Sequence, residues 1–218
     1  MVIITCAGLG SRFKGYINYP KQLLPLKNGK YLIESIIENV KGIDENIVLV
    51  CNENNYKYFK FLGLPIVIVD KLKGSAYSGS YAIKDENEPL VVIDSDGFYS
   101  KNIFKELKEI LKTKNCCVVD ERLKDSKLYS FVITENDRVI KTIEKEEGGD
   151  YGIIGIYGFR NTQEYKQAVN KMLETINPKE YTNALVYNFL TDNTYLKTTE
   201  YKILGTPRQY EDYISKRM

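Results

Sequence analysis

A glycine-containing turn follows the first apolar run of the chain and lies close to several cations. Val2–Thr5 is a β-branched run, and residues 6–12, which read CAGLGSR, come directly after it. Glycines at such a turn let bare backbone N–H groups approach a ligand. Arg12, Lys14 and Lys21 place three positive charges near the turn. This combination predicts a binding site for a polyphosphate.

Two common phosphate-binding motifs do not account for this turn. The dinucleotide fingerprint requires a third glycine where this chain has Phe13, and the ATPase P-loop requires a closing Gly-Lys-Ser/Thr that is absent. What remains is the longer string A-G-x-G-S-R, followed at short range by Pro20-Lys21. The structural alternative is a plain strand-to-helix turn with solvated basic residues.

Two carboxylates end a second apolar run. Residues 90–97 read LVVIDSDG, so Asp94 and Asp96 lie at the carboxyl end of a predicted buried strand, where open α/β sheets bind ligands. Side chains at i and i+2 of a strand share a face, so both aspartates can approach one divalent ion such as Mg²⁺. The alternative is that one of them caps a helix in the stretch after Ser100.

Composition excludes several other chemistries. The chain has 218 residues, a net charge of +2, four cysteines and no histidine. Catalytic triads, His-ligated zinc and a His general base are therefore excluded, whereas phosphoryl or nucleotidyl transfer needs mainly positioning and charge neutralisation. The charge gives no case for a nucleic-acid partner. We find no membrane-length apolar run and expect a cytoplasmic protein.

The periodicity of apolar residues predicts an α/β fold. We expect strands at Val2–Thr5, Asn46–Cys51, Pro65–Val69, Leu90–Ile93 and Cys116–Val119, and helices at Leu32–Val40 and Ile103–Leu111. Later strands are expected at Leu128–Thr134, Arg138–Glu144, Gly152–Phe159, Tyr195–Lys197 and Tyr201–Leu204, and later helices at Thr162–Ile176, at Thr182–Leu190 and after Pro207.

The A-G-x-G-S-R…P-K string resembles the signature of nucleotidyltransferases that form nucleotide-sugars, and of related short cytidylyltransferases. Weaker similarities extend from Val2 to about Tyr213. The resemblance implies a single-domain Rossmann-like (GT-A-type) fold, in which a mixed, mostly parallel sheet is flanked by helices. We interpret 1–218 as one domain, with a nucleotide-binding part at 1–120 and a smaller β-rich acceptor-binding part at 121–218.

The resemblance also assigns roles to residues. The expected catalytic residues are Arg12, Lys21, Asp96 and Lys145. The expected nucleotide-binding residues are Ala7, Gly8, Leu9, Gly10, Ser11, Arg12, Lys21, Gly74, Ser75, Ala76 and Asp94. The expected acceptor-binding residues are Ser130, Glu144, Lys145 and Gly155, and the expected Mg²⁺ ligands are Asp96 and Asp94. On sequence alone, Ser75 is equally well explained as a helix N-cap, and Glu144–Glu147 as a solvated hairpin cluster.

Three positions depart from the pattern of these relatives. Ser130 replaces a usual glycine, and Glu146 replaces a usual proline. Ile203 stands two residues before Gly205, where many members carry an aspartate that is the second metal ligand. The alternatives are that another residue such as Asp94 completes the metal site, or that the ion relies on Asp96 and substrate phosphates.

The resemblance implies an enzyme of the EC 2.7.7 type. It would couple an NTP to a phosphorylated small molecule, most simply a sugar-1-phosphate, and release pyrophosphate in the synthesis of surface polysaccharide or glycoconjugates. A cytidylyltransferase for phosphocholine or another phosphorylated amine or amino acid is an alternative, with Tyr77, Tyr81, Tyr129 and Tyr151 as candidates for an aromatic cage. A non-catalytic nucleotide-binding module and a GT-A glycosyltransferase are alternatives of other classes. A homo-oligomer is a further option.

Overall fold

The structure is a computed structural model of the chain and describes residues 1–41, 44–84, 87–124, 126–145 and 148–216. Its helices are α1 (Leu32–Val40), α2 (Glu53–Phe59), α3 (Ser75–Ser80), α4 (Lys101–Ile110), α5 (Thr162–Thr175), α6 (Asn183–Val186) and α7 (Pro207–Ser215). Its strands are β1 (Val2–Thr5), β2 (Ile47–Cys51), β3 (Ile66–Ile68), β4 (Leu90–Asp94), β5 (Gly97–Tyr99), β6 (Asn115–Asp120), β7 (Ser130–Glu135), β8 (Arg138–Glu144), β9 (Tyr151–Phe159), β10 (Asn193–Lys197) and β11 (Tyr201–Ile203). Among the described residues, no helix is long and apolar enough to cross a membrane.

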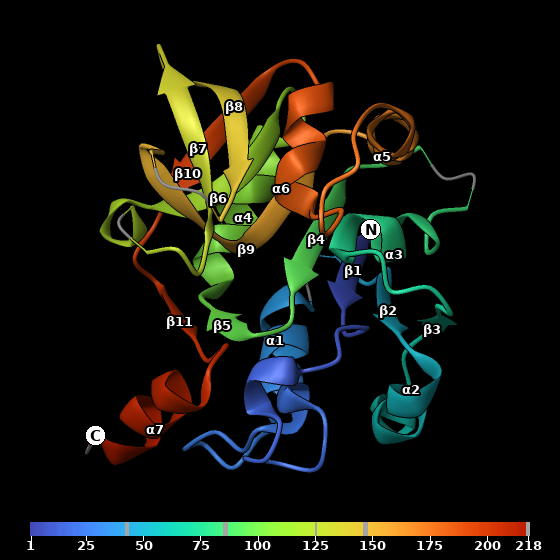
Figure 1. Cartoon of the computed structure of the whole chain (residues 1–218), viewed down its shortest axis with the longest axis vertical. Helices are drawn as coiled ribbons and strands as arrows, with labels where there is room; N and C mark the ends of the chain where they lie inside the picture. The colour runs from blue at the N-terminus through green and yellow to red at the C-terminus, as the bar shows by residue number, and fades with distance from the viewer. Residues whose placement is uncertain (42–43, 85–86, 125, 146–147, 217–218) are drawn as a thin grey trace.

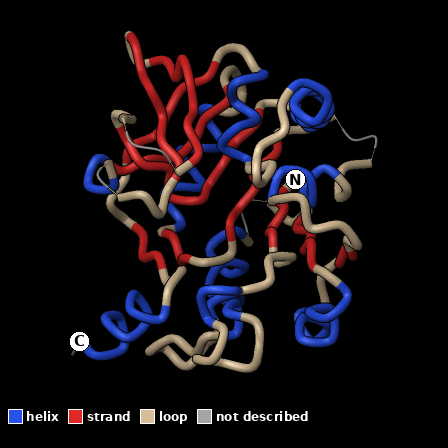
Figure 2. The backbone as a smooth tube through the Cα atoms, viewed as in Figure 1, coloured by secondary structure: helices blue, strands red, loops and turns tan. Residues whose placement is uncertain are grey.

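A mixed sheet forms the centre of the molecule. Within the described residues it contains nine strands, in the order β10-β6-β9-β4-β1-β2-β3, with β7 and β8 added beside β9. Strands β1, β2, β3 and β4 pair in parallel, and β9 runs antiparallel between β4 and β6. Figure 2 shows the strands in red through the middle and upper part of the molecule, with helices in blue around them. The predicted mixed, mostly parallel sheet is confirmed.

The strands are apolar on both faces because helices cover both faces. Along β1, Val2 and Ile4 point into one hydrophobic core, and Ile3 points into the other. Helices α1 and α4 contribute to the first core, whereas α3, α5 and α6 contribute to the second. Figure 1 shows the latter three helices grouped on one side. This two-sided burial fixes the strand register.

The register brings two predicted functional segments together. Thr5, the last residue of β1, lies directly beside Asp94, the last residue of β4. Both strands run in the same direction, so the glycine turn and the aspartate turn leave the sheet at the same edge. The site is therefore built by strand ends, as the sequence pattern predicts.

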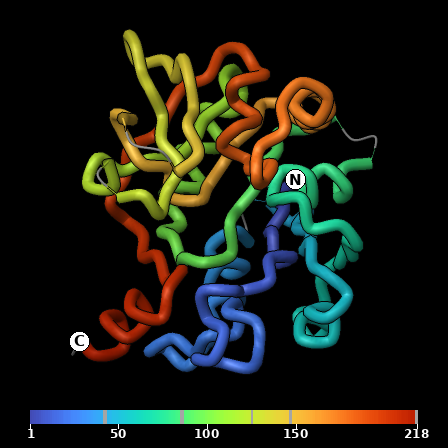
Figure 3. The backbone as a smooth tube through the Cα atoms, viewed as in Figure 1, coloured from blue at the N-terminus to red at the C-terminus, as the bar shows by residue number. Residues whose placement is uncertain are grey.

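The two parts of the sequence that meet near residue 120 interleave in space. Strand β9, from the later part, lies between β4 and β6 of the earlier part. Helix α7 reaches back to the N-terminal loops, where the Tyr210 hydroxyl donates to the Pro25 carbonyl at 2.9 Å and the Lys27 N–H donates to the Tyr213 hydroxyl at 3.0 Å. Figure 3 shows this red C-terminal segment descending toward the blue N-terminal loops. The C-terminal residues therefore help to support the N-terminal loops.

Candidate active site

One cavity of about 410 Å³ opens at the carboxyl ends of β1 and β4. The predicted site residues that line it are Ala7, Gly8, Leu9, Ser11, Arg12, Lys21, Gly74, Ser75, Asp94, Asp96, Ser130, Glu144, Lys145 and Gly155. They come from seven separated stretches of sequence, so the fold gathers segments that are far apart in the chain into one site.

The glycine turn forms one wall of this cavity. Gly10 has φ +62 and ψ +29, a left-handed conformation that glycine adopts at little cost, and a short 3-10 turn at Ser11–Phe13 follows it. In the described part of the chain, no hydrogen-bond partner is found for the N–H groups of Gly8, Leu9 and Gly10. The side-chain amides of Asn52 and Asn55 donate to the Ala7 and Cys6 carbonyls at 2.7 and 3.2 Å. The turn thus keeps free donors while its carbonyls are held from behind.

A second glycine segment is held against the residues that precede α6. Gly74 has φ +127, and a Cβ there would lie 2.4 Å from the Tyr181 carbonyl oxygen. The Tyr181 N–H donates to the Lys73 carbonyl at 2.8 Å, and its carbonyl accepts from the Ala76 N–H at 2.9 Å. Both the backbone conformation and the close approach therefore require glycine at position 74.

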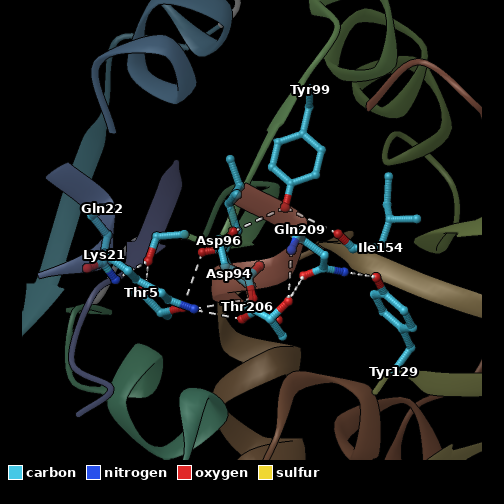
Figure 4. A network of polar contacts seen from close by, with 12 residues as sticks. Thr5, Lys21, Gln22, Asp94, Asp96, Tyr99, Tyr129, Ile154, Thr206 and Gln209 are labelled. Carbon is cyan, nitrogen blue, oxygen red and sulfur yellow. Dashed lines mark hydrogen bonds and ion pairs between the residues drawn. The ribbon is translucent and has the colours of Figure 1, made fainter. Parts of the chain in front are cut away.

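Lys21 and Asp96 meet inside the cavity. The Lys21 Nζ lies 3.3 Å from the Asp96 Oδ2, and the two side chains are 21% and 22% exposed. Figure 4 shows this pair at the centre of a polar network, with Asp94 next to it. Asp96 lies in the two-residue turn between β4 and β5, so it is not on the strand itself. A cation and an anion at partial exposure leave both groups available to a charged ligand.

Asp94 is the more enclosed of the two aspartates. Burial, as the largest cause, and the negative charge of Asp96 together raise the pKa of its carboxyl group to about 7, against the opposing effect of Lys21. The Tyr157 hydroxyl donates to its Oδ2 at 3.2 Å, and the Thr5 hydroxyl lies 3.4 Å from its Oδ1. Gly155, with φ +88, adjoins it, and a Cβ there would lie 3.1 Å from the Asp94 Cβ.

Charged side chains form the other end of the cavity. The Glu144 Oε2 accepts from the hydroxyls of Ser130 and of Thr182, the latter at 2.8 Å. Lys145 Nζ lies 3.0 Å from Glu144 Oε1 and 3.6 Å from Glu180 Oε2. Burial lowers the pKa of Lys145, but the two carboxylates outweigh this effect, and the net direction is upward. Lys145 is therefore a stable cation facing the cavity.

Two predicted nucleotide-binding residues do not line this cavity. Gly10 lines a neighbouring hollow, to which Gly8, Leu9 and Ser11 also contribute. Ala76 is fully buried, and its N–H is already bonded to Tyr181. Its N–H holds the segment around Gly74 in place, and contact between this segment and a nucleotide stays a prediction.

The structure also decides several of the structural alternatives. The helix after Ser100 is capped by Ser100 itself, whose hydroxyl accepts from the Asn102 N–H, so neither aspartate is a cap. Gly74 stands at the N-cap of α3, and Ser75 is the first helical residue. The pair Glu146 and Glu147, with the departure at 146, lies outside the described residues.

The suggested tyrosine cage does not form. Only Tyr129 of the four tyrosines lines the cavity. Tyr77 pairs with Tyr81 at a ring distance of 5.1 Å, and Tyr151 pairs with Tyr195 at 5.2 Å. The tyrosines were assigned by type alone, and tertiary structure separates them.

Sequence reasoning missed several lining residues because their types carry no motif signal at those positions. They are Thr5, Gln22, Leu72, Ser78, Ser95, Leu128, Ile153, Ile154, Tyr157, Glu180, Thr182 and Gln209, besides Tyr129, Ile203 and Gly205, which were named for other reasons. Adjacency to a named motif was the one available signal, and it applies to Thr5, Gln22 and Ser95.

The two aspartates fit a hard divalent cation. Carboxylate oxygens are the donors that Mg²⁺ prefers. Burial and then the charge of Asp96 raise the pKa of Asp94, and a cation would relieve the repulsion between the two carboxylates. Space beside both carboxylates is kept by glycines, since a Cβ at Gly205 would lie 2.8 Å from the Asp96 Oδ2. Among the described residues, no group of three or more His, Cys, Asp or Glu side chains is placed to hold a metal. Ile203 lines the cavity and supplies no ligand.

Comparison with known proteins relates this geometry to one family. The family model described as the MobA-like NTP transferase domain matches residues 2–145. The chain is 30% identical over 166 residues to D-glycero-alpha-D-manno-heptose 1-phosphate guanylyltransferase of Campylobacter jejuni, covering 71% of this chain and 73% of that protein. It is 36% identical over 109 residues to choline-phosphate cytidylyltransferase of Streptococcus pneumoniae, covering 47% of each.

Matches to longer proteins and to solved structures complete the comparison. The chain spans less than half the length of the bifunctional GlmU proteins that it matches. A crystal structure of a nucleoside-diphosphate-sugar pyrophosphorylase from Vibrio cholerae superimposes with a TM-score of 0.82 and 19% identity, over 99% of this chain and all of that one. This structural likeness supports the fold.

Proposed function

The chain belongs to the MobA-like NTP transferase family, and on this premise we propose that it is a nucleotidyltransferase. It transfers a nucleoside monophosphate from an NTP to a phosphorylated small molecule, with a sugar-1-phosphate as the first candidate, and releases pyrophosphate. The product would supply the synthesis of surface polysaccharide or glycoconjugates. The reaction is of the EC 2.7.7 type.

One observation carries this proposal. A single cavity holds two separate cationic centres: Lys21 beside Asp96 at one end, and Lys145 beside Glu144 at the other. A transferase that joins two phosphates needs one positively charged group for each, at either side of the reacting phosphorus. Arg12 lines the same cavity and is close enough to Lys145 to lower the pKa of that lysine.

The chemistry needs no covalent intermediate and no general base. An oxygen of the acceptor phosphate, already anionic, attacks the α-phosphorus in line. The bond from the α-phosphorus to the bridging oxygen breaks, and pyrophosphate leaves with that oxygen. Arg12, Lys21 and the free N–H groups of the glycine turn neutralise the triphosphate, and Lys145 orients the attacking phosphate.

We propose Mg²⁺ as the cofactor, held by Asp96 together with Asp94. When bound, the ion neutralises charge on the phosphates. The lack of a third acidic ligand among the described residues implies that substrate phosphate oxygens or water complete its coordination. Four free, buried cysteines agree with a reducing compartment such as the cytoplasm.

A phosphorylated amine is the second candidate acceptor. Glu180 stands beside Lys145 in addition to Glu144, so two carboxylates flank this position. An ammonium group would find compensating charge there. The similarity to a choline-phosphate cytidylyltransferase supports the same candidate.

The direct test is a pyrophosphate-release screen. CTP, UTP, dTTP, GTP and ATP would each be combined with Mg²⁺ and with pooled sugar-1-phosphates or pooled phospho-amines. We expect release that requires both an NTP and an acceptor pool. Nucleotide binding without release in any combination would favour a non-catalytic module. Binding of nucleotide-sugars with indifference to NTPs would favour a GT-A glycosyltransferase.

A further inference from the structure

Ser95 lies between the two site aspartates and is itself buried. Its residue is 3% exposed, and its hydroxyl donates to the Thr5 carbonyl at 2.5 Å. The same hydroxyl accepts from the Gln22 side-chain amide at 2.8 Å, and Gln22 is also 3% exposed. The amide, the hydroxyl and the carbonyl therefore form one buried donor chain in which every bond has good length.

This chain joins three segments that the sequence separates. Thr5 ends β1 and begins the glycine turn, Gln22 belongs to the turn that carries Lys21, and Ser95 belongs to the turn that carries Asp96. The Ser95 hydroxyl also lies against the Cys6 thiol. Figure 4 shows Thr5, Lys21 and Gln22 on one side of the network, opposite Asp94 and Asp96.

Two contacts between the same two turns run in parallel. Lys21 forms an ion pair with Asp96. Gln22, which follows Lys21 in the sequence, forms a hydrogen bond with Ser95, which precedes Asp96. The ion pair is partly exposed, and exposed pairs of long side chains do not hold a geometry on their own. The buried hydrogen bond between Gln22 and Ser95 is shielded from water, and its two groups have few alternative partners, so it can hold the two turns at a fixed separation.

We propose that Ser95 and Gln22 are positioning residues, whose buried hydrogen bonds set Lys21 opposite Asp96 for nucleotidyl transfer. The inference rests on the proposed function. Neither side chain needs to touch substrate. Each acts through its neighbour, and a shift of about 1 Å in such a neighbour is enough to reduce a rate by about a hundredfold.

The test is a double-mutant cycle with Gln22→Met and Lys21→Ala. Methionine keeps the volume of glutamine and removes the donated bond, whereas Ser95→Ala would leave the buried amide unpaired and is the harsher second variant. Tyr187→Phe is the matched control, because it removes one buried hydroxyl, bonded to the Gly158 carbonyl at 3.0 Å, away from the cavity.

We expect Gln22→Met to lower kcat about tenfold while KM for the NTP changes less than about threefold. Its Tm should fall no further than that of Tyr187→Phe, whose kcat should stay at the wild-type value. In the Lys21→Ala background, Gln22→Met should change kcat by less than about twofold, because its effect passes through Lys21. An equal loss of kcat in both backgrounds, or no loss in wild type, overturns the inference.

A structural readout separates this inference from the proposed function. The lysines are dimethylated with ¹³C-formaldehyde, and their methyl signals are recorded by NMR. The Lys21 signal is the one that is absent in Lys21→Arg. Its chemical shift should change in Asp96→Asn. We expect the same shift in Gln22→Met and in Ser95→Ala, but not in Tyr187→Phe. A wild-type chain that releases no pyrophosphate would refute the proposed function, while an unchanged Lys21 signal in Gln22→Met would refute the positioning role.

Discussion

The two ends of the cavity are built differently. At the nucleotide end, strand ends, glycines and buried hydrogen bonds hold the backbone, as in the bond from Ser95 to the Thr5 carbonyl. At the acceptor end, charged side chains hold one another, as in the contacts of Lys145 with Glu144 and Glu180. Glu180 is more than half exposed, and Lys145 has φ +53.

This difference shows how one fold can keep a reaction and change a substrate. In the proposed function, backbone donors and buried bonds would recognise what all NTPs share, the triphosphate, and such groups tolerate little substitution. Exposed side chains on loops can change without affecting the core. The family match covers the whole glycine turn and ends at Lys145, whereas Glu180 and Thr182 lie beyond it. We therefore expect substitutions at the two ends to have separable effects.

The largest effect is expected for Asp96→Asn. Loss of this carboxylate removes the partner of Lys21 and the expected Mg²⁺ ligand, so kcat should fall by about a thousandfold. Pyrophosphate release at saturating substrates measures the change. Asp192→Asn is the matched control, because Asp192 is exposed, pairs with Arg138 at 3.2 Å and has a φ of +55 that asparagine tolerates. Comparable rates for the two variants would contradict the role of Asp96.

The next largest effect is expected for Gly74→Ala, on stability. The added Cβ would lie 2.4 Å from the Tyr181 carbonyl oxygen in a backbone conformation with φ +127. Strain and overlap together should reduce the free energy of unfolding by about 3 kcal/mol, measured by urea denaturation. Gly148→Ala is the matched control, because Gly148 has φ +108 but open space around it. Gly148→Ala should lose less than half as much free energy of unfolding as Gly74→Ala. Equal losses would contradict the prediction that overlap with Tyr181 adds to the backbone strain at Gly74.

A smaller effect is expected for Asp94→Asn, and it should depend on pH. The folded-state pKa of Asp94 is about 7, above its ordinary value of 3.8, so the folded protein binds an extra proton between these pH values. Wild-type stability contributed by this group is present below about pH 4 and is lost as the pH rises through 7. Asparagine cannot ionise, so the variant should gain about 1–3 kcal/mol relative to wild type between pH 4 and pH 8.

The pKa of Asp120 is shifted in the opposite direction from that of Asp94. Burial raises its pKa, but hydrogen bonds from Arg122 and Tyr201 outweigh this effect and lower the pKa overall. Its contribution to stability is present above about pH 4 and is lost at more acidic pH. Asp120→Asn should therefore destabilise by the same amount at pH 6 and at pH 8. A stability difference for Asp94→Asn that is flat with pH would contradict the raised pKa.

The smallest effect is expected for Lys145→Met, at the acceptor end. Loss of the ammonium group should raise KM for the phosphorylated acceptor by about tenfold and leave KM for the NTP within about twofold. Initial rates with each substrate varied in turn measure this split. Lys197→Met is the matched control, because its Nζ lies over the Tyr151 ring at 4.2 Å and outside the cavity. If Lys145→Met changed KM for the NTP more than KM for the acceptor, the proposed division of the cavity into two ends would be contradicted.

Local sequence determined the elements and the glycine turn. The β-branched run Val2–Thr5 and the apolar spacing in Leu32–Val40 predicted a strand and a helix with the bounds that the structure has. Both rest on side-chain periodicity and burial, which can be recognised within ten residues. The short elements β5 and α2 have weak or mixed patterns and were not predicted, and α3 was anticipated only as the alternative in which Ser75 caps a helix. Asp94, Asp96, Lys21 and Arg12 were found because their types and spacing point to phosphate chemistry.

Tertiary structure decided which of these residues meet. Thr182 stands 38 positions from Glu144, and Gln22 stands 73 positions from Ser95, yet each pair shares a hydrogen bond. The candidate cage tyrosines form two separate pairs, Tyr77 with Tyr81 and Tyr151 with Tyr195. Ala76 is buried in the core. Periodicity reports which face of an element is buried, but contacts between elements depend on strand order and register. Those are set by how the whole core closes, and no local pattern encodes them.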